Sequence, residues 1–388
     1  MLYVRSILSI GFVAFWGAFS VFASASDASV EERLQALESV KFSGSFRFNY
    51  LIKDNDDSQK DRAGDAEFNL FNLGVDTESD GIKFSGQYRW YNYTDTVHHL
   101  YLGFENESGS ELQLGLMKVP FGILPYESNN WWFGIPYYLG FNDDYDMGIK
   151  YLTKSGNWDI QAAFYISSEF SAGNTKRYSV DVISSSVNDT STTSDNSSRN
   201  EESNQANLRL AYQLPSGEMG VSAQVGQLYN SAEEENGSRW AAALHHIAQY
   251  GNFHSQVELI SYEFSPENPD GVSDDVIRVG ALADSYEIAA KGNIYVLNLA
   301  YDVPINNSRI SNLRFYNDYS HLEKDADDFT ESQLNVTGVA ITSGAVYTNV
   351  DFIMGRNILY ISGARDGYAQ GTDDDWSTRF NINIGYYF

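Results

Sequence analysis

Apolar and polar residues alternate with a period of two through most of the chain after Lys41. The segment RFNINIG (379–385) shows this pattern, with phenylalanine and isoleucine at even positions and arginine, asparagine and glycine at odd positions. Successive side chains of a strand point to opposite faces, so the segment predicts a strand with one apolar and one polar face. A half-buried strand of a soluble protein gives the same pattern, so this segment alone does not fix the class of β protein.

Several further segments repeat the alternation over about ten residues, which is the length of a strand that spans a membrane in a barrel. They are 43–52, 81–92, 157–167, 206–212 and 311–320. Charged side chains are costly when they face lipid, so the polar face must line the lumen. The predicted pore-lining residues are Lys83, Arg89, Asp159, Arg209, Arg314, Asp318 and Arg379.

The connections between these segments alternate in length. Short ones are expected at 77–81, 107–110, 154–156, 215–218, 251, 303–309 and 343–344, and long or polar ones at 53–65, 93–96, 120–144, 168–204, 230–237, 265–290, 321–331 and 357–375. This asymmetry separates periplasmic turns from extracellular loops. The chain therefore predicts an all-β fold, a 16-stranded antiparallel transmembrane barrel at 41–388. An extra strand in 276–290 would make the number odd, so that segment is assigned to the sixth long loop.

The N-terminus has the features of a secretory signal at 1–25. Arg5 precedes an apolar run, 7–22, which ends at the small-residue sequence ASA (23–25). Cleavage there is expected, and an uncleaved anchor is the alternative. Residues 26–40 place Val30, Leu34 and Leu37 at heptad spacing, which predicts a short periplasmic helix. It is either an isolated amphipathic helix or a coiled coil that joins protomers.

Composition narrows the class of protein. The chain has 25 basic and 52 acidic residues, a formal net charge of −27, which argues against nucleic acid as a partner. It has no cysteine and therefore no disulfide framework. The 27 tyrosines and 23 phenylalanines suit the aromatic girdles of an outer-membrane barrel. The predicted location is the outer membrane of a Gram-negative bacterium, in contact with lipid and lipopolysaccharide.

The sequence carries little that predicts catalysis, so no enzymatic activity, no cofactor and no metal are expected. The pairs His98-His99 and His245-His246 should point to opposite faces of their strands, which is unsuitable for one shared metal. The acidic runs 143–146 and 373–375 offer hard oxygen ligands for a divalent cation. Neither has the spacing of a calcium hand, so both are predicted to be solvated loop acids.

The loop between 117 and 151 is the most informative connection. Three prolines, Pro120, Pro125 and Pro136, prevent it from pairing as strands, and its aromatic residues require burial. It is therefore predicted to fold into the lumen and narrow the pore. The predicted constriction residues are Lys118, Glu127, Trp131, Trp132, Asp143, Asp144, Asp146 and Lys150.

The chain resembles the phosphate-selective porin O and P family in KVPFG (118–122), in YDMGIKY (145–151), in the short N-terminal helix and in the final Phe388. The resemblance implies a homotrimer in which each barrel has its own pore. It also implies that Phe388 closes the last strand and is read by the barrel-insertion machinery. The chain departs from the family because residues 119–149 contain no lysine or arginine, so phosphate selectivity is not carried over.

The function predicted from the sequence is passive diffusion of small hydrophilic solutes and ions through a porin. The acids of the loop predict a weak cation preference. A channel selective for sugars or for phosphate-type anions is the alternative within this class. A barrel with an enzymatic or adhesive role and a soluble periplasmic β protein are the alternatives outside it.

Overall fold

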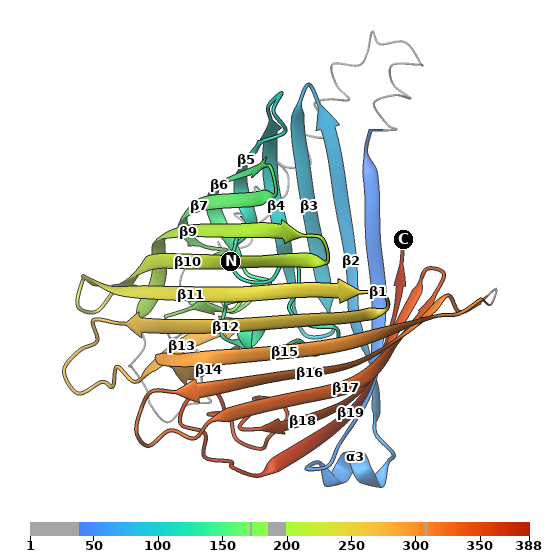
Figure 1. Ribbon diagram of the computed structural model, residues 1–388. Helices are drawn as coiled ribbons and strands as arrows, with labels where there is room; N and C mark the ends of the chain where they lie inside the picture. Colours follow the sequence, from blue (N-terminus) through green and yellow to red (C-terminus); the bar gives the residue numbers. More distant parts are fainter. Residues whose placement is uncertain (1–38, 171–172, 185–198, 307–308) are drawn as a thin grey trace, which may run out of the picture.

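The computed structural model is a closed barrel of sixteen antiparallel strands (Figure 1). It describes residues 39–170, 173–184, 199–306 and 309–388. The predicted signal peptide, and all of the predicted helix except residues 39 and 40, lie outside the described residues. Within the described ranges, no helix is long and apolar enough to span a membrane.

The barrel strands follow one another around the wall in chain order. They are β1 (Lys41–Lys53), β2 (Asp65–Ser79), β3 (Ile82–Tyr91), β4 (Asp95–Glu105), β5 (Glu111–Lys118), β6 (Tyr145–Ser155), β7 (Trp158–Ser168), β9 (Asn200–Leu214), β10 (Gly217–Asn230), β11 (Glu235–Tyr250), β12 (Phe253–Ser265), β15 (Lys291–Pro304), β16 (Asn312–Lys324), β17 (Ser332–Ser343), β18 (Val346–Arg356) and β19 (Trp376–Tyr387). The predicted number of strands and the seven short connections are confirmed. A short helix, α3 (Asp57–Asp61), lies in the connection between β1 and β2.

The first and last strands close the barrel. Their pairing extends from Ser45 opposite Tyr387 to Lys53 opposite Arg379. Beyond this ladder, the N–H of Phe388 donates to the carbonyl of Gly44 at 3.0 Å, and the N–H of Gly44 donates to the carbonyl of Phe388 at 2.9 Å. The backbone groups of the two strands are therefore paired along the seam, as a lipid-facing sheet requires.

A second, three-stranded sheet is separate from the barrel wall. It consists of β14 (Asp284–Ala289), β13 (Val276–Ala281) and β8 (Asp181–Val182). The hairpin of β13 and β14 belongs to the sixth long connection. The sequence predicted this placement of 276–290, because an extra barrel strand would have made the number of strands odd. Its side chains are largely buried, so it is an internal element rather than a spanning one.

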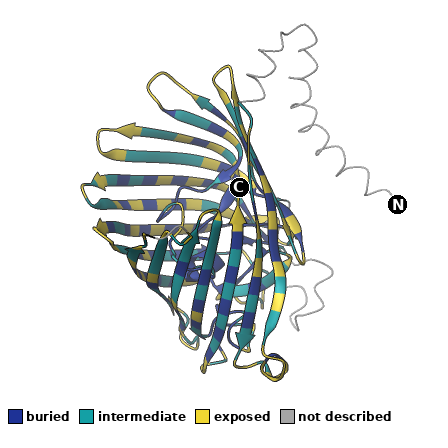
Figure 2. Ribbon diagram, turned by 90° about the vertical axis from the view of Figure 1, so that its right-hand side faces the viewer, coloured by how far each residue is buried: buried dark blue, intermediate teal, exposed yellow. Residues whose placement is uncertain are grey.

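Burial alternates along the barrel strands (Figure 2). In β9, Leu208 is 43% exposed on the outer face, while its neighbours Asn207 and Arg209 are buried inside. The same alternation places Arg379, Asn381 and Asn383 of β19 inside. An outer surface covered with apolar and aromatic side chains requires an apolar surrounding, which is the condition of a transmembrane barrel.

The prediction that His98 and His99 face opposite ways is wrong. The pairing of β3 with β4 shifts between Gln87 and Tyr88, so His98 is an extra residue in β4. Such a bulge interrupts the alternation and re-aims a side chain. The two rings approach with their Nδ1 atoms 2.8 Å apart, and His98 packs against Tyr145 and Tyr178.

Candidate functional site

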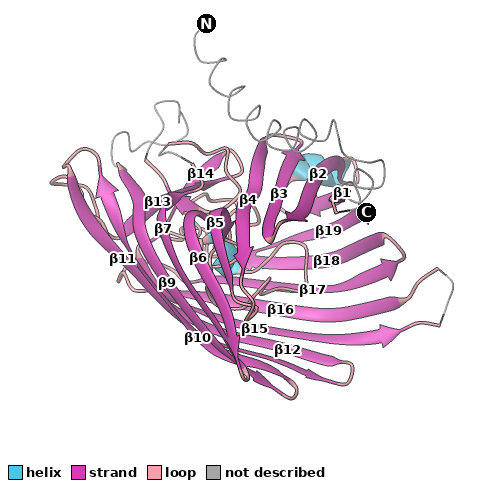
Figure 3. Cartoon of the chain, turned by 90° about the horizontal axis from the view of Figure 1, so that it is seen from above, coloured by secondary structure: helices cyan, strands magenta, loops and turns pink. Residues whose placement is uncertain are grey.

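The third long loop, residues 119–144, lies against inward-facing side chains of the barrel. Seen from above, its short helix α4 (Ile135–Tyr138) lies within the ring of strands (Figure 3). The N–H of Gly122 donates to Ser222 of β10 at 3.0 Å, and Arg209 of β9 donates to the carbonyl of Gly122 at 2.8 Å. The N–H of Ile135 donates to Ser320 of β16 at 3.1 Å.

Asp318 of β16 holds the tip of the third long loop. Its carboxylate accepts four hydrogen bonds, from the backbone N–H groups of Asn129 (2.7 Å) and Asn130 (3.0 Å) and from their side-chain amides (2.8 and 2.7 Å). A carboxylate that accepts bonds from backbone N–H groups is a strong, charge-assisted anchor. Asn298 of β15 adds a bond to the carbonyl of Glu127.

Two further carboxylates are buried where the third long loop meets the wall. Glu258 of β12 accepts the N–H of Ile123 at 3.0 Å. Glu127 is fully buried; its Oε1 accepts the N–H of Gly134 at 2.9 Å, while its Oε2 has no partner. Burial raises the pKa of Glu127 well above its usual range, and the nearby carboxylates of Glu258 and Asp318 raise it further.

This raised pKa predicts that Glu127 makes the folded barrel less stable as the pH rises. Between the ordinary glutamate pKa of 4.5 and the raised native value, the folded state holds a proton that the unfolded state has lost. Stability therefore falls with rising pH, by up to about 1.4 kcal/mol per pH unit for one proton. The variant Glu127→Gln is expected to lose less thermal stability than the wild type between pH 5 and pH 8, measured by calorimetry in detergent. The exposed Glu107→Gln serves as control, and equal slopes in all three proteins would contradict the prediction.

A cavity of about 1320 Å³ lies on the other side of the third long loop. The loop contributes aromatic side chains, Tyr126, Trp131, Trp132 and Phe133. The barrel contributes the inner faces of β19, β1, β2 and β3, including Asn49, Asn69, Asn72 and Asn383. The third long loop thus leaves an open space along one part of the wall, lined by aromatic side chains of the loop and polar side chains of the strands.

Three arginines project from that wall: Arg47 of β1, Arg89 of β3 and Arg379 of β19. Arg379 lies over the ring of Trp132, 4.6 Å from its centre, and Arg89 lies 4.4 Å from the ring centre of Tyr178. Among the described residues, none of the three arginines forms an ion pair with a carboxylate.

Most acidic groups of the cavity are neutralised by a partner. Asp65 pairs with Arg62 at 2.8 Å, Asp143 with Lys118 at 2.5 Å and Asp284 with Arg365 at 2.7 Å. Glu67 accepts a hydrogen bond from Asn92 at 3.3 Å. Among the described residues, the cavity therefore presents three guanidinium groups and the ammonium group of Lys53 without an ion-pair partner, and its field favours negative solutes.

The predicted site residues fall into separate groups. Those that line the cavity are Arg89, Trp131, Trp132, Asp143 and Arg379. Those that hold the third long loop are Lys118, Arg209 and Asp318. The remaining lumenal residues form ion pairs elsewhere on the wall: Lys83 with Glu105 and Glu111, Asp159 with Arg209, and Arg314 with Asp302.

Four residues predicted at the constriction do not line the cavity: Glu127, Asp144, Asp146 and Lys150. Each is at least nine-tenths buried, so the expectation that Asp144 and Asp146 are solvated loop acids is wrong. Glu127 and Asp144 belong to the third long loop, whereas Asp146 and Lys150 belong to β6. Lys150 donates to the carbonyl of Lys118 at 2.8 Å. Arg47 was missed, although its place between Phe46 and Phe48 in the first alternating segment marks it as inward-facing.

The architecture is that of outer-membrane porins. No family model and no curated protein sequence matches the chain. Solved structures match over 90% of its length. OmpF of Salmonella typhi, in complex with daunomycin, matches with a TM-score of 0.59 and 9% identity over 97% of its own chain. The anion-selective porin of Comamonas acidovorans matches with a TM-score of 0.56 and 12% identity over 99% of its own chain. The trimer form of OmpT, an outer membrane protein of Vibrio cholerae, matches with a TM-score of 0.54 and 13% identity over 99% of its own chain.

Proposed function

We propose that the protein is an outer-membrane porin through which small hydrophilic solutes diffuse passively. The observation that carries the proposal is the cavity of about 1320 Å³ between the third long loop and the wall of β19, β1, β2 and β3. A polar lumen within an apolar outer surface suits a diffusion channel.

The ionic preference that the cavity supports is for small anions rather than cations. The cation preference expected from the sequence rested on Asp143, Asp144 and Asp146. Asp143 is paired with Lys118, and the other two do not line the cavity. The guanidinium groups of Arg47, Arg89 and Arg379 are left as the dominant charges, and guanidinium groups bind carboxylates and phosphates in a bidentate manner. Phosphate selectivity was not carried over from the family that the motifs resemble, and a channel selective for phosphate-type anions stays an alternative.

Assembly and biogenesis are part of the same proposal. Trimers suit the fold, since the matched OmpT structure is described as a trimer form. The expected entry into the membrane through the insertion machinery rests on the terminal strand, whose Phe388 pairs with Gly44 at the barrel seam. Crosslinking of the intact protein in membranes tests the oligomeric state.

A planar bilayer experiment tests the proposed channel. The purified wild-type protein is expected to give stepwise, ohmic conductance. Across a KCl gradient, its reversal potential should lie on the anion side, that is, nearer to the equilibrium potential of chloride than to that of potassium. The preference should weaken as salt rises, because ions screen the arginines. Absence of conductance from folded protein would refute the channel, whereas a cation-side reversal potential would refute only the anion preference.

A further inference from the structure

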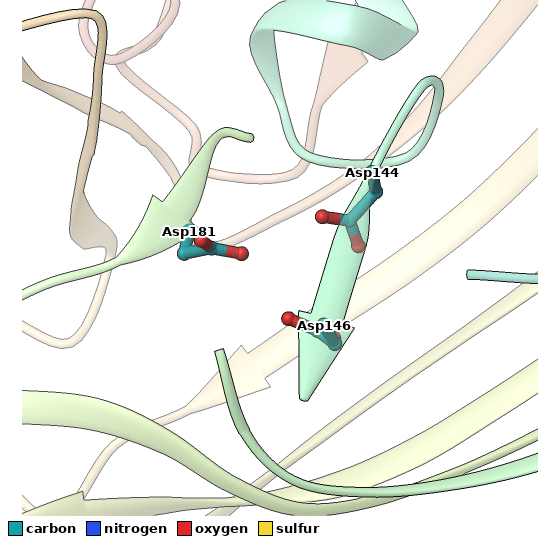
Figure 4. Close-up of side chains that lie close together, drawn as sticks. All are labelled: Asp144, Asp146 and Asp181. Carbon is teal, nitrogen blue, oxygen red and sulfur yellow. The ribbon is translucent and has the colours of Figure 1, made fainter. Parts of the chain in front are cut away.

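Three aspartates form a buried cluster between the barrel wall and the inner sheet. Asp144 ends the third long loop, Asp146 lies near the start of β6, and Asp181 opens β8. Figure 4 shows the three carboxylates turned toward a common space. One oxygen from each lies within 4.8 Å of the others, and the residues are 6%, 2% and 1% exposed.

The cluster lacks the donors that three buried carboxylates need. Asp181 Oδ2 accepts from Arg177 Nη1 at 2.9 Å, and Asp146 Oδ2 accepts from Gln205 Nε2 at 3.2 Å. The Oδ1 atoms of all three aspartates are buried without a hydrogen-bond partner. Buried polar atoms are almost always satisfied, because leaving them bare is costly. Three neighbouring carboxylate oxygens without a hydrogen-bond donor therefore indicate that a positively charged ligand is missing.

Gln205 of β9 is an independent sign of such a ligand. It is 3% exposed, its amide lies against Asp146, and its Oε1 atom has no partner. The two ends of an amide are distinguished only by their hydrogen bonds. A half-turn of this amide would present Oε1 to the cluster, as a fourth neutral oxygen.

The local charge balance is negative. The carboxylates of Glu169 and Glu202 interact with the cluster, and Arg177 and Arg239 oppose them. With all seven groups ionised, the buried net charge is −3. Arg177 and Arg239 therefore leave part of the negative charge uncompensated.

We propose that Asp144, Asp146 and Asp181 bind one calcium ion, with Gln205 as a further oxygen ligand. Calcium takes six to eight oxygen ligands at about 2.3–2.6 Å in irregular geometry, so oxygens on opposite sides of the ion are about 5 Å apart. The separation in the cluster fits within that sphere. Magnesium suits the site less well, because it demands a regular octahedron and retains several waters. The ion ties the inner sheet to the point where the third long loop rejoins the wall.

Terbium luminescence tests this site on the purified, folded barrel in detergent. Tb³⁺ substitutes for calcium, and the buried Tyr165, whose environment includes Asp144 and Asp146, sensitises its emission. We expect one Tb³⁺ per chain, displaced by CaCl₂ more readily than by MgCl₂. The double variant Asp144→Asn, Asp146→Asn should weaken binding by at least about tenfold, the lower bound for groups that merely support a metal ligand. The matched control Asp327→Asn, Asp328→Asn alters two exposed loop acids and should bind as the wild type does.

Thermal unfolding keeps the test decisive. Calcium is expected to raise the melting temperature of the wild type and of the control, but not of the double variant, whose folding is checked by its heat-modifiable migration on gels. Equal binding by wild type and double variant would overturn the proposal. So would the absence of calcium binding by the wild type at millimolar concentration, which would mean that the aspartates are neutralised by protons. Neither result bears on conductance, so the proposed channel is judged separately.

Discussion

Replacing Asp318 with alanine is expected to free the tip of the third long loop and to raise the single-channel conductance. The substitution removes all four hydrogen bonds that hold Asn129 and Asn130. A buried donor that loses its acceptor costs about 1–3 kcal/mol, and here several amide donors lose theirs together. Two other wall residues bind next to these bonds: Asn349 donates to the carbonyl of Asn129 at a long 3.4 Å, and Asn298 donates to the carbonyl of Glu127. The loop should therefore move, and conductance should become larger and noisier.

The control for this experiment is Asp302→Asn. Asp302 is also an inward-facing carboxylate, but it pairs with Arg314 at 2.7 Å and makes no bond to the third long loop. Its conductance should stay close to that of the wild type. An unchanged conductance and noise level in Asp318→Ala would mean that the tip does not limit the passage.

Neutralising the arginine wall, the three arginines that line the cavity, is expected to abolish the anion preference of the channel. The variant carries Arg47→Gln, Arg89→Gln and Arg379→Gln, all of which line the cavity. A unit charge acting over about 8 Å of water contributes about 0.5 kcal/mol. Each charge acts with opposite sign on anions and cations, so three such charges change the permeability ratio by about 3 kcal/mol, or roughly a hundredfold before salt screens them. With the arginines gone, Lys53 and Glu67 remain at the cavity, and neither forms an ion pair among the described residues. Their charges balance, so the reversal potential should move close to zero.

A charge-matched control separates this local effect from that of net charge. Lys60, Lys154 and Lys176 are not among the residues that line the cavity, and replacing all three with glutamine changes the net charge by the same amount. This control should keep the reversal potential of the wild type. Equal shifts in both triple variants would show that the preference arises from the overall charge of the protein, not from the arginine wall.

The strands, their number and their inward faces could be predicted from the sequence because a membrane barrel imposes a local rule. Every second residue meets lipid, and every backbone group must be paired between strands. The alternation in 379–385 and the polarity of the connections are consequences of that rule. They correctly placed Arg379 inside and kept 276–290 out of the wall.

The tertiary structure alone decided which lumenal residues face open space. Asp318 and Arg379 have the same signature in the sequence, a charge on a polar strand face. One is covered by the third long loop, whose tip is 188 residues away in the chain, and the other lines the cavity. The path of the third long loop depends on bonds to β9, β10, β12, β15 and β16, and no local pattern encodes such long-range contacts. For the same reason the sequence predicted Asp144 and Asp146 to be solvated acids. They meet Asp181 in a buried cluster only once the chain has folded.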